Sequence, residues 1–444
     1  DEIDWAVPQN FNLGSYAGSF TLEEALAELD SMRATYPHLI TARASAATET
    51  TLEGRTVYFV KISDNPDIDE DEPETLYNSL IHAREIASLM NQIYYMWYLL
   101  ENYDTDPGIK NLVDNHELYF IPILNPDGYQ FNIDNNPNGG GLQRKNRRVT
   151  SGCGGDNDGV DLNRNSGYFW NNGGASSNPC AQDFRGTGPF SEPESRIVRD
   201  FVLSRDFKVA LDHHAFSNIL YHSYSSINAS TGREDEFSQY GHDMSFYNRY
   251  GYGAVTQTGP PVASGSHIDW LLGGTIPDGT GSTGSGKNII AFSPENGSSA
   301  EGGFYPLPSN ILPIAQRAMR VNLLAGYYSG KYAKYKDLTP SNISEITGQL
   351  HVGVAYLGQT LSPITLTVTP VSSNILSIGT AQTVNLAKLE QTTLDFSYTL
   401  DPNIQANDVI QYEVTLANED YTLYQAVIQK RFSPTAIFTD TVSY

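Results

Sequence analysis

The chain has 444 residues, and its 27 lysines and arginines against 51 aspartates and glutamates give a net charge of −24. Such an acidic protein lacks the basic surface that nonspecific binding to nucleic acid or to anionic membranes requires. A hydrophobic content of 39% excludes a wholly disordered chain. No apolar run approaches the roughly 20 residues of a membrane-spanning helix. We therefore expect neither a nucleic-acid partner nor a transmembrane segment.

The first three quarters of the chain alternate helix and strand signals. Residues 21–24 form a capping-box pattern, and apolar residues then recur at helical spacing up to Pro37. Further strand-like segments lie at 57–62, 118–124, 208–216 and 288–293, and helical patterns begin at Ser191 and cover 313–327. This alternation predicts an α/β fold in which helices cover a sheet.

After about Tyr335 the pattern changes. Residues 347–440 are rich in Thr, Val, Ile and Leu, with short alternating runs such as 364–368 and turn signals between them. No convincing helical pattern occurs there, so we expect a separate small β-sandwich of roughly 100 residues. The predicted domains are 1–335, which carries every candidate site described below, and 336–444, an accessory domain to which we assign no role.

A metal site is suggested by His82 and Glu85, which lie three residues apart ahead of a helical pattern. An imidazole nitrogen and a carboxylate suit zinc, but two ligands leave a catalytic site incomplete, and a surface ion pair is the more common explanation of such a pair. A third ligand could come from His213 or His214, near the end of a predicted strand. Because side chains alternate along a strand, only one of these should face such a site, and periodicity does not say which.

Basic residues gather in one short stretch of this acidic chain. Four of the 27 lie within 144–148, beginning at Arg144. A solvated loop is one explanation, and a binding site for an anion is the other. Further along, Asn163 and Arg164 place an amide beside a guanidinium, a pair that can clamp a carboxylate through charge-assisted hydrogen bonds.

Two more carboxylates could complete a zinc site. Asp161 could accept a hydrogen bond from a zinc-bound histidine and so fix its tautomer. Glu295 ends a hydrophobic strand pattern, where a general base could stand, although a single carboxylate at a strand end is commonly unremarkable.

Cys153 and Cys180 are the only cysteines, and both lie in a stretch rich in Gly and Asn. One pair in a chain of this length fits a single disulfide in an exported protein, whereas two free thiols would fit a cytosolic one. The chain begins at Asp1 without a Met or an apolar leader, so we expect a mature or trimmed form. The expected location is secreted, that is, extracellular or periplasmic.

In this order the motifs resemble those of the zinc metallocarboxypeptidases of the carboxypeptidase A type. The resemblance covers about residues 12–328 and rests on 82–85, 125–128, 144–147, 161–164 and 268–270, together with His214 and Glu295. Within that family the chain looks closest to the bacterial carboxypeptidase T branch, because 72–77 leads into 82–85. The resemblance implies a central mixed β-sheet flanked by helices, and an enzyme that removes single C-terminal residues from peptides and proteins.

The resemblance also implies one catalytic zinc ion and its surroundings. The zinc ligands would be His82, Glu85 and His214, and Asp161 would stand behind the first of them. The register of 214–217 selects His214 over its neighbour. The pairing of the two cysteines around Asn163 likewise resembles the disulfide of animal members.

For catalysis, Arg144 matches the arginine that stabilises the oxyanion, and Glu295 matches the general base. Asn163 and Arg164 match the pair that grips the terminal carboxylate of the substrate. That grip restricts cleavage to the chain end, since an internal peptide bond offers no carboxylate.

Specificity is carried by positions that flank this centre. Arg84 and Phe304 match flanking subsites, and Ser266 and Ile268 match the floor of the side-chain pocket. Because the floor is uncharged, we expect a preference for hydrophobic or aromatic C-terminal residues. The family's capping tyrosine falls at Pro261, which has no hydroxyl and no free φ, so we expect weaker capping of the substrate.

A second metal is suggested by the acidic run 64–74, which has seven carboxylates and no basic residue. A solvated acidic loop is the simple explanation, but hard cations such as calcium prefer several oxygen ligands. Asp69, Glu70, Glu74 and Glu117 match calcium-binding positions of the carboxypeptidase T branch, so we expect structural calcium in addition to zinc.

Two other functions remain open at this stage. A zinc amidohydrolase on the same scaffold, such as a deacylase of N-acyl amino acids or an enzyme that trims peptidoglycan stem peptides, would keep the same ligands and base. A catalytically inactive binding module would need a lost ligand or base, and none of the expected ones is missing. Our leading hypothesis is a monomeric zinc carboxypeptidase.

Overall fold

The computed structural model describes residues 5–150, 152–258, 262–275 and 286–434, and the chain divides into two compact units, 1–329 and 330–444. The expected boundary after residue 335 lies inside β9 (Ala333–Asp337), which belongs to the second unit. None of the helices in the described ranges has the length and apolar character that crossing a bilayer requires.

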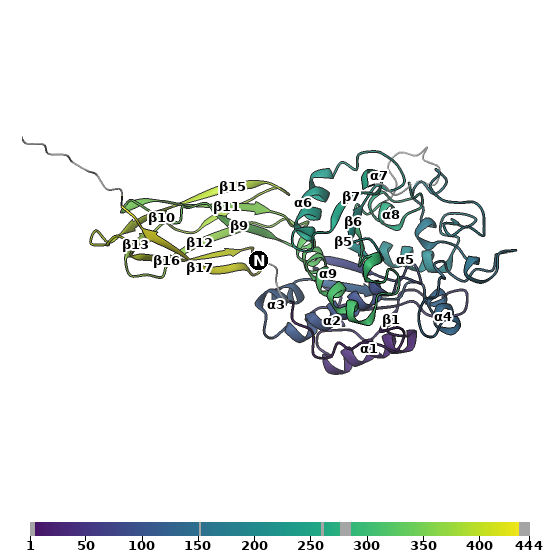
Figure 1. The fold of residues 1–444 in the computed structure, drawn as a ribbon. Coiled ribbons are helices and arrows are strands. Elements are labelled where there is room, and N and C mark those ends of the chain that lie inside the picture. The colour runs from purple at the N-terminus through teal and green to yellow at the C-terminus, as the bar shows by residue number, and fades with distance from the viewer. Residues whose placement is uncertain (1–4, 151, 259–261, 276–285, 435–444) are drawn as a thin grey trace, which may run out of the picture. The chain divides into compact units, whose positions relative to one another are not determined.

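An eight-stranded sheet forms the centre of the first unit (Figure 1). Its middle strands β4, β3, β5 and β8 are parallel, whereas β1 with β2, β2 with β4, and β8 with β6 pair antiparallel. The sheet is therefore mixed, as expected. In spatial order its strands are β1 (Ala44–Ser45), β2 (Tyr58–Ile62), β4 (Glu117–Ile121), β3 (Glu74–Asn78), β5 (Phe207–Asp212), β8 (Ile290–Glu295), β6 (Ile219–His222) and β7 (Gly251–Ala254).

Helices pack against both faces of this sheet, because successive side chains of a central strand point to opposite sides. Leu76 of β3 lies in the core cluster that holds Ile197 and Ile268, from α5 and α8. The next residue, Tyr77, packs on Tyr95 of α2 and donates a hydrogen bond to a carbonyl of α9. The helices are α1 (Leu22–Thr35), α2 (Ile86–Asn102), α3 (Pro107–Asp114), α4 (Pro126–Asn135), α5 (Pro193–Leu203), α6 (Glu234–Ser245), α7 (Val255–Thr258), α8 (His267–Gly273) and α9 (Pro308–Ser329).

Local sequence signals set where several elements begin and end. The predicted capping box is confirmed at α1, where Glu24 N donates to Thr21 Oγ1 at 3.1 Å and Thr21 N donates to Glu24 Oε2 at 2.8 Å. Strand β4 stops before Asn125, whose side chain caps α4 by accepting a hydrogen bond from Gly128 N at 3.0 Å. The strand expected over 208–216 ends earlier, at Asp212, so both candidate histidines lie just beyond β5.

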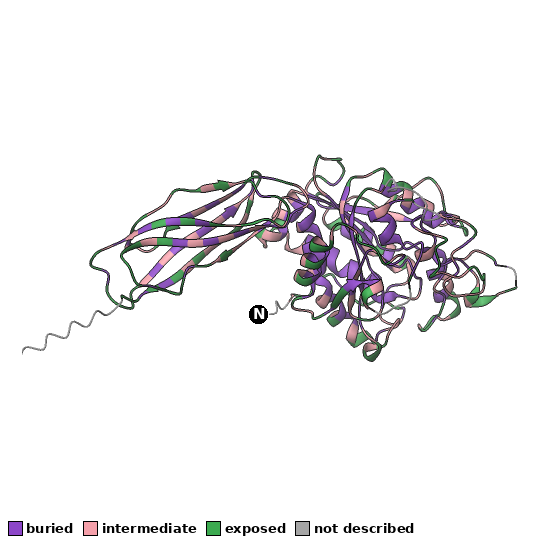
Figure 2. Ribbon diagram, turned by 90° about the horizontal axis from the view of Figure 1, so that it is seen from above, coloured by how far each residue is buried: buried purple, intermediate pink, exposed green. Residues whose placement is uncertain are grey.

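The second unit is all-β, and the described part of it, 330–434, contains no helix. Buried and exposed residues alternate along its strands, and the buried ones form one core between two sheets (Figure 2). One sheet consists of β10 (Asn342–Ile343), β17 (Thr422–Phe432), β16 (Val409–Ala417), β12 (Ile364–Pro370) and β14 (Gln382–Val384). The other consists of β13 (Ile375–Ile378), β15 (Gln391–Leu400), β11 (Thr347–Tyr356) and β9. The predicted fold class, an α/β unit followed by a small all-β unit, is confirmed.

Candidate metal centre and active-site pocket

Three parallel strands bring the candidate metal ligands together. His82 and Glu85 lie between the end of β3 and the start of α2, and His214 follows the end of the neighbouring β5. His214 also forms a bridge with Glu295, the last residue of β8. Because the carboxyl ends of parallel strands meet at one edge of a sheet, residues that are far apart in the sequence converge there.

The donor atoms of this group are close enough to bind a single ion. His82 Nδ1 lies 2.8 Å from Glu85 Oε1, and His214 Nδ1 lies 2.9 Å from Glu85 Oε2 and 3.1 Å from His82 Nδ1. All three side chains are buried. Two imidazole nitrogens and a carboxylate form the ligand set of a catalytic zinc site with an open position. Although burial opposes it, the two imidazoles lower the pKa of Glu85, which favours the anionic form that a metal needs.

The two adjacent histidines have different environments. His213 Nδ1 lies 3.2 Å from the amide nitrogen of Asn91 and 3.1 Å from that of Asn296, away from the other ligands. Burial lowers the pKa of His213 to about 3, so this side chain is neutral at physiological pH. The structure thus brings His214, and not His213, to the candidate metal site.

Asp161 lies directly behind His82. Its Oδ1 is 3.1 Å from His82 Nε2, and its Oδ2 accepts hydrogen bonds from Arg144 Nε and Nη2 at 3.0 and 2.9 Å. Although burial opposes it, Arg144 and His82 hold the pKa of Asp161 well below its usual range. A carboxylate in this position keeps the proton on Nε2 and leaves Nδ1 of His82 free for a metal.

These residues open onto one pocket of about 360 Å³. It brings together ten of the side chains predicted from the sequence: His82, Glu85, Arg144, Asn163, Arg164, His214, Ser266, Ile268, Glu295 and Phe304. Arg84 does not line it but lies with its guanidinium carbon 4.2 Å from the centre of the Phe304 ring. The remaining lining residues are Ala215, Phe216, Ser217, Tyr221, Ser225, Val255, Ala263 and Ser293, none of which the sequence analysis had singled out.

The sequence comparisons agree with this geometry. Residues 25–321 match the sequence model of a family described as Zinc carboxypeptidase. The chain belongs to the zinc carboxypeptidase family. It is 29% identical over 311 residues to carboxypeptidase A1 of Sus scrofa, and the alignment covers 68% of each chain. It is 30% identical over 269 residues to carboxypeptidase A2 of Mus musculus, and the alignment covers 59% of this chain and 60% of that one.

Solved structures share the fold of this zinc carboxypeptidase. Thrombin activatable fibrinolysis inhibitor superposes with a TM-score of 0.60 at 23% identity, over 70% of this chain and 74% of that one. Carboxypeptidase A from Helicoverpa armigera superposes with a TM-score of 0.58 at 24% identity, over 71% of this chain and 74% of that one. The family match and the buried donor set together identify His82, Glu85 and His214 as the zinc ligands of the carboxypeptidase, and zinc as its cofactor.

Asn163 and Arg164 lie on a short turn of helix, Leu162–Arg164, whose first amide groups bind Asp161. Asn163 Oδ1 accepts a hydrogen bond from His267 N at 2.9 Å, so its amide nitrogen points into the site. Arg164 Nε is buried and has no hydrogen-bond partner among the described residues. A buried donor without a partner is costly, and an anionic substrate group would satisfy it.

A close approach of two loops supports this pair. Gly265 has a φ of +68°, and a Cβ atom there would lie 2.3 Å from the carbonyl oxygen of Arg164. Ser166 N donates to the carbonyl of Gly265 at 3.0 Å. Any side chain at position 265 would therefore push the pocket floor away from the Asn163–Arg164 turn.

Ser266 and Ile268, the uncharged residues expected at the floor of the pocket, both line it. The adjacent Asp269 is fully buried. The Asp269 carboxylate accepts hydrogen bonds from the backbone N–H and hydroxyl groups of Ser225 and Ser226, at 2.6 to 2.9 Å. Its negative charge is thus used inside the protein and is not presented to a ligand.

Glu295, the last residue of β8, also lines the pocket. Burial raises its pKa to about 7, and the nearby Glu85 carboxylate acts in the same direction. A carboxylate with a pKa close to neutrality can both take up and release a proton at physiological pH, which is what a general base requires.

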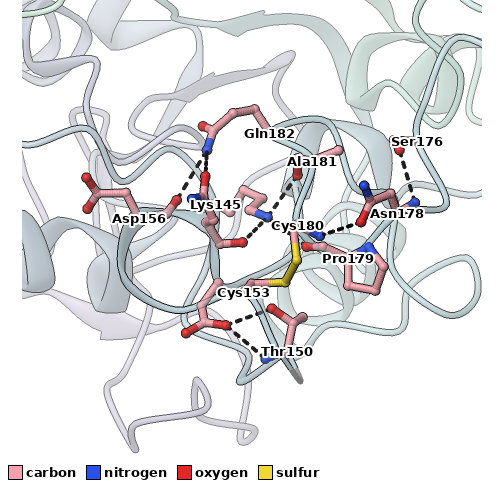
Figure 3. The surroundings of a disulfide bond; sticks show 12 residues. Lys145, Thr150, Cys153, Asp156, Ser176, Asn178, Pro179, Cys180, Ala181 and Gln182 are labelled. Atoms are coloured by element: carbon pink, nitrogen blue, oxygen red, sulfur yellow. Dashed lines mark hydrogen bonds between the residues drawn. A yellow bond between two sulfur atoms is a disulfide. The ribbon is translucent and has the colours of Figure 1, made fainter.

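The segment 153–180, which includes Asn163 and Arg164, is closed by a disulfide, whose surroundings are shown in Figure 3. Cys153 and Cys180 form a disulfide, so the prediction of a single disulfide is confirmed. The buried Lys145 donates from Nζ to the carbonyl groups of Asn157, Pro179 and Ala181, at 2.6, 3.1 and 2.9 Å. Of the basic stretch 144–148, Arg144 alone lines the pocket.

The four carboxylates expected to bind calcium do not form one group. Asp69, Glu74 and Glu117 have oxygens within 4.8 Å of one another, but Glu70 belongs to a second group, with Asp64 and Glu72. Two basic side chains already contact the first group: Lys61 bonds Glu117, and Arg205 Nη1 lies 3.1 Å from Asp69.

Pro261, expected at the capping position, lies outside the described residues.

Proposed function

We propose that this zinc carboxypeptidase is a secreted, monomeric exopeptidase that releases single C-terminal residues from peptides and proteins and prefers hydrophobic or aromatic ones. One observation carries the proposal. The zinc ligands, Glu295, and the Asn163–Arg164 pair surround a single pocket whose floor is uncharged. This arrangement can hold a free carboxylate and an apolar side chain beside the metal at the same time.

The chemistry follows from the groups that line the pocket. His82, Glu85 and His214 would hold the zinc ion, which would supply Lewis-acid polarisation of the scissile carbonyl when bound. Glu295 takes a proton from the attacking water and passes it to the leaving amine, for which its raised pKa suits it. Arg144 stabilises the negative charge that develops on the carbonyl oxygen. Its contact with Asp161 holds the guanidinium in place for that role.

Exopeptidase selectivity comes from Asn163 and Arg164. The unpartnered Nε of Arg164 and the amide of Asn163 can donate to the terminal carboxylate of a bound peptide. An internal peptide bond has no charged group to place there, so its binding would leave both donors and the buried guanidinium unsatisfied.

Preference for the C-terminal side chain follows from Ser266 and Ile268. A lysine or arginine side chain placed against them would be desolvated without a partner, because the Asp269 carboxylate is already fully hydrogen-bonded. Arg84 and Phe304, stacked on one another, would contact the residues that precede the scissile bond.

Three finer assignments belong to the same proposal. The disulfide supports export, because disulfides persist in oxidising compartments. The segment 72–77 supports the carboxypeptidase T branch, and with it a structural calcium bound by Asp69, Glu74 and Glu117 together with, or next to, Glu70.

The test uses a library of peptides with blocked N-termini, with products identified by mass. We expect loss of single C-terminal residues, faster for Phe and Leu than for Lys and Arg. Matched controls are the chelated protein, the Glu295→Gln variant, and the same peptides with amidated C-termini, all of which should remain uncleaved. Internal cuts or removal of an N-terminal acyl group would overturn the exopeptidase assignment, and faster release of Lys or Arg would overturn the specificity.

A further inference from the structure

A second buried carboxylate lies close to the zinc ligands. Asp212, the last residue of β5, is completely buried. Its Oδ2 lies 3.2 Å from Nδ1 of His267 and 3.6 Å from Nε2 of the zinc ligand His214. Its Oδ1 has no hydrogen-bond partner among the described residues. Burying a carboxylate whose oxygens are not all hydrogen-bonded is unfavourable, so this position calls for a reason.

The orientation of the His214 ring indicates that reason. Nδ1 faces Glu85 and His82, which leaves Nε2 directed away from the metal position. If Nδ1 provides the lone pair for zinc, Nε2 must carry the ring proton and needs an acceptor. The acceptor must come from the groups around Nε2.

Two groups lie near that nitrogen, and only one of them can accept. Asn163 Nδ2 is 3.3 Å from His214 Nε2. Because Asn163 Oδ1 is engaged by the backbone N–H of His267, the group that Asn163 turns to the ring is its NH₂, which is a donor. The carboxylate of Asp212 is the other group, and it is an acceptor only.

The two zinc histidines therefore have parallel surroundings. His82 turns Nδ1 to the metal position and Nε2 to Asp161, which is bonded in turn by Arg144. His214 turns Nδ1 to the metal position and Nε2 toward Asp212, at 3.6 Å instead of the 3.1 Å between His82 and Asp161, and Asp212 is bonded in turn by His267. A carboxylate behind a metal-bound histidine fixes its tautomer and increases its basicity as a ligand.

We propose that Asp212 is a positioning residue for the zinc ligand His214, and that His267 holds Asp212 in place. This inference rests on the zinc centre of the proposed function. It gives the site a second histidine–carboxylate pair, and it connects the metal to the pocket floor, because His267 lies between the lining residues Ser266 and Ile268. Substitution of Asp212 should then weaken zinc binding before it affects the fold.

The experiment measures zinc affinity of the full chain by competition with a chromophoric chelator. Removal of such an outer partner commonly costs about 10- to 100-fold in metal affinity, and we expect a loss in that range for Asp212→Asn. Asp127→Asn is the matched control, since Asp127 is an equally buried carboxylate that pairs with Thr51 and Arg55. Its affinity should stay within about 2-fold of the unmodified protein; an Asp212→Asn affinity in that same range would overturn the proposal.

A second measurement does not depend on how a variant folds. In the unmodified zinc-loaded protein with ¹⁵N-labelled histidine, the His214 ring should carry its proton on Nε2, and that proton should exchange slowly with water. A proton on Nδ1, or fast exchange at Nε2, would overturn the positioning role. These results are separable from the proposed function, because failure of the latter would appear as unmodified protein that does not bind zinc or that cleaves peptides when chelated.

Discussion

Arg144 makes a two-pronged contact with Asp161: Nε and Nη2 donate to the same oxygen, Oδ2, at 3.0 and 2.9 Å. The third nitrogen, Nη1, stays outside this contact and lies 3.6 Å from Glu85 Oε1, at the wall of the pocket. One guanidinium thus fixes the carboxylate behind His82 and keeps a donor for the substrate. The two tasks use different nitrogens of one side chain, so a substitution of Arg144 affects both.

Arg144→Gln removes the charge from the pocket. We expect kcat to fall by about 10²- to 10³-fold, the usual cost of losing one oxyanion donor, with a much smaller change in KM. Arg144→Lys should recover part of kcat, because it restores the charge but not the fork that binds Asp161. Steady-state kinetics at saturating zinc test this, with Arg147→Gln as control, since Arg147 bonds Gln143 outside the pocket. A kcat within about 3-fold of the unmodified enzyme would contradict the assignment.

Glu295→Gln should abolish most of the turnover while zinc is retained. Loss of a general base costs about 10²- to 10⁴-fold, and Glu295 is not one of the zinc ligands, so the metal content should stay the same. The pH profile gives a second readout. Burial raises the pKa of Glu295 to about 7, and a nearby cation lowers it, so kcat/KM should fall as the pH drops through a value below 7. If the variant keeps kcat, or loses zinc, the role is wrong.

Much of this site could be predicted because the key residues come in short segments with their own chemistry. His82 with Glu85, and Asn163 with Arg164, are neighbours in sequence, and each pair suggests a cation or an anion partner by itself. The alternation of strand and helix patterns then places such segments at strand ends, where the sheet brings them together. The choice of His214 over His213 needed the family resemblance, because alternation along a strand says that only one of two adjacent side chains faces the site and not which one.

Contacts between distant segments could not be predicted. Asp212 had no visible partner in the sequence, since His267 is far along the chain and meets it only across the sheet edge. Tyr221 enters the pocket because β6 pairs with β8 in a register that sets it beside Ser293. The sequence likewise did not show how the four expected calcium-binding carboxylates are grouped: Asp69, Glu74 and Glu117 lie together, and Glu70 lies with Asp64 and Glu72.

Glu194 is a buried carboxyl that should make stability depend on pH. Burial raises its pKa to about 8, and one of its oxygens, Oε1, has no hydrogen-bond partner among the described residues. The folded state therefore prefers the protonated form. Its stabilising contribution is complete below the unfolded pKa of 4.5 and is lost as the pH rises towards about 8, with a slope of up to about 1.4 kcal/mol per pH unit.

Glu194→Gln should remove this dependence, because the amide cannot ionise. Relative to the unmodified protein, the variant should gain stability between pH 5 and pH 8, measured as the difference in free energy of unfolding or in Tm at each pH. Asp200→Asn, at an exposed site on the same helix, is the control. It should leave the pH dependence of both the free energy of unfolding and Tm unchanged. Parallel curves for Glu194→Gln and the unmodified protein would show that Glu194 is ionised in the fold.

Calcium should raise Tm at constant zinc, since a ligand that binds only the folded state stabilises it. Burial raises the pKa of Glu74 to about 7 and that of Glu72 to about 8. Protons therefore compete with the cation, and the calcium-dependent shift should be larger at pH 8 than at pH 6. Thermal scans with and without calcium test this, with Glu74→Gln as the variant that should respond less. A Tm that calcium does not change at either pH would reject the calcium site.

Lys145 and the Cys153–Cys180 disulfide should act together on substrate binding. Lys145 donates to carbonyl groups on both sides of the loop that holds Asn163 and Arg164, and the disulfide spans a sequence separation of 27 residues. Lys145→Met leaves three carbonyls without their donor, so we expect an increase in KM of about 5- to 10-fold with kcat nearly unchanged, because the zinc ligands and Glu295 lie on other segments. Lys145→Arg should retain more of the affinity.

Replacing both cysteines by serine should lower the free energy of unfolding by about 3–4 kcal/mol and raise KM in the same direction. Because Lys145 and the disulfide hold the same loop, their effects should not add. The triple variant should show a smaller increase in log KM than the sum of the increases in the lysine variant and in the double cysteine variant. Kinetics on a single peptide, with Lys208→Met on strand β5 outside this loop as the control, give all terms of this cycle. Strictly additive effects on KM would mean that the lysine and the disulfide support different parts of the site.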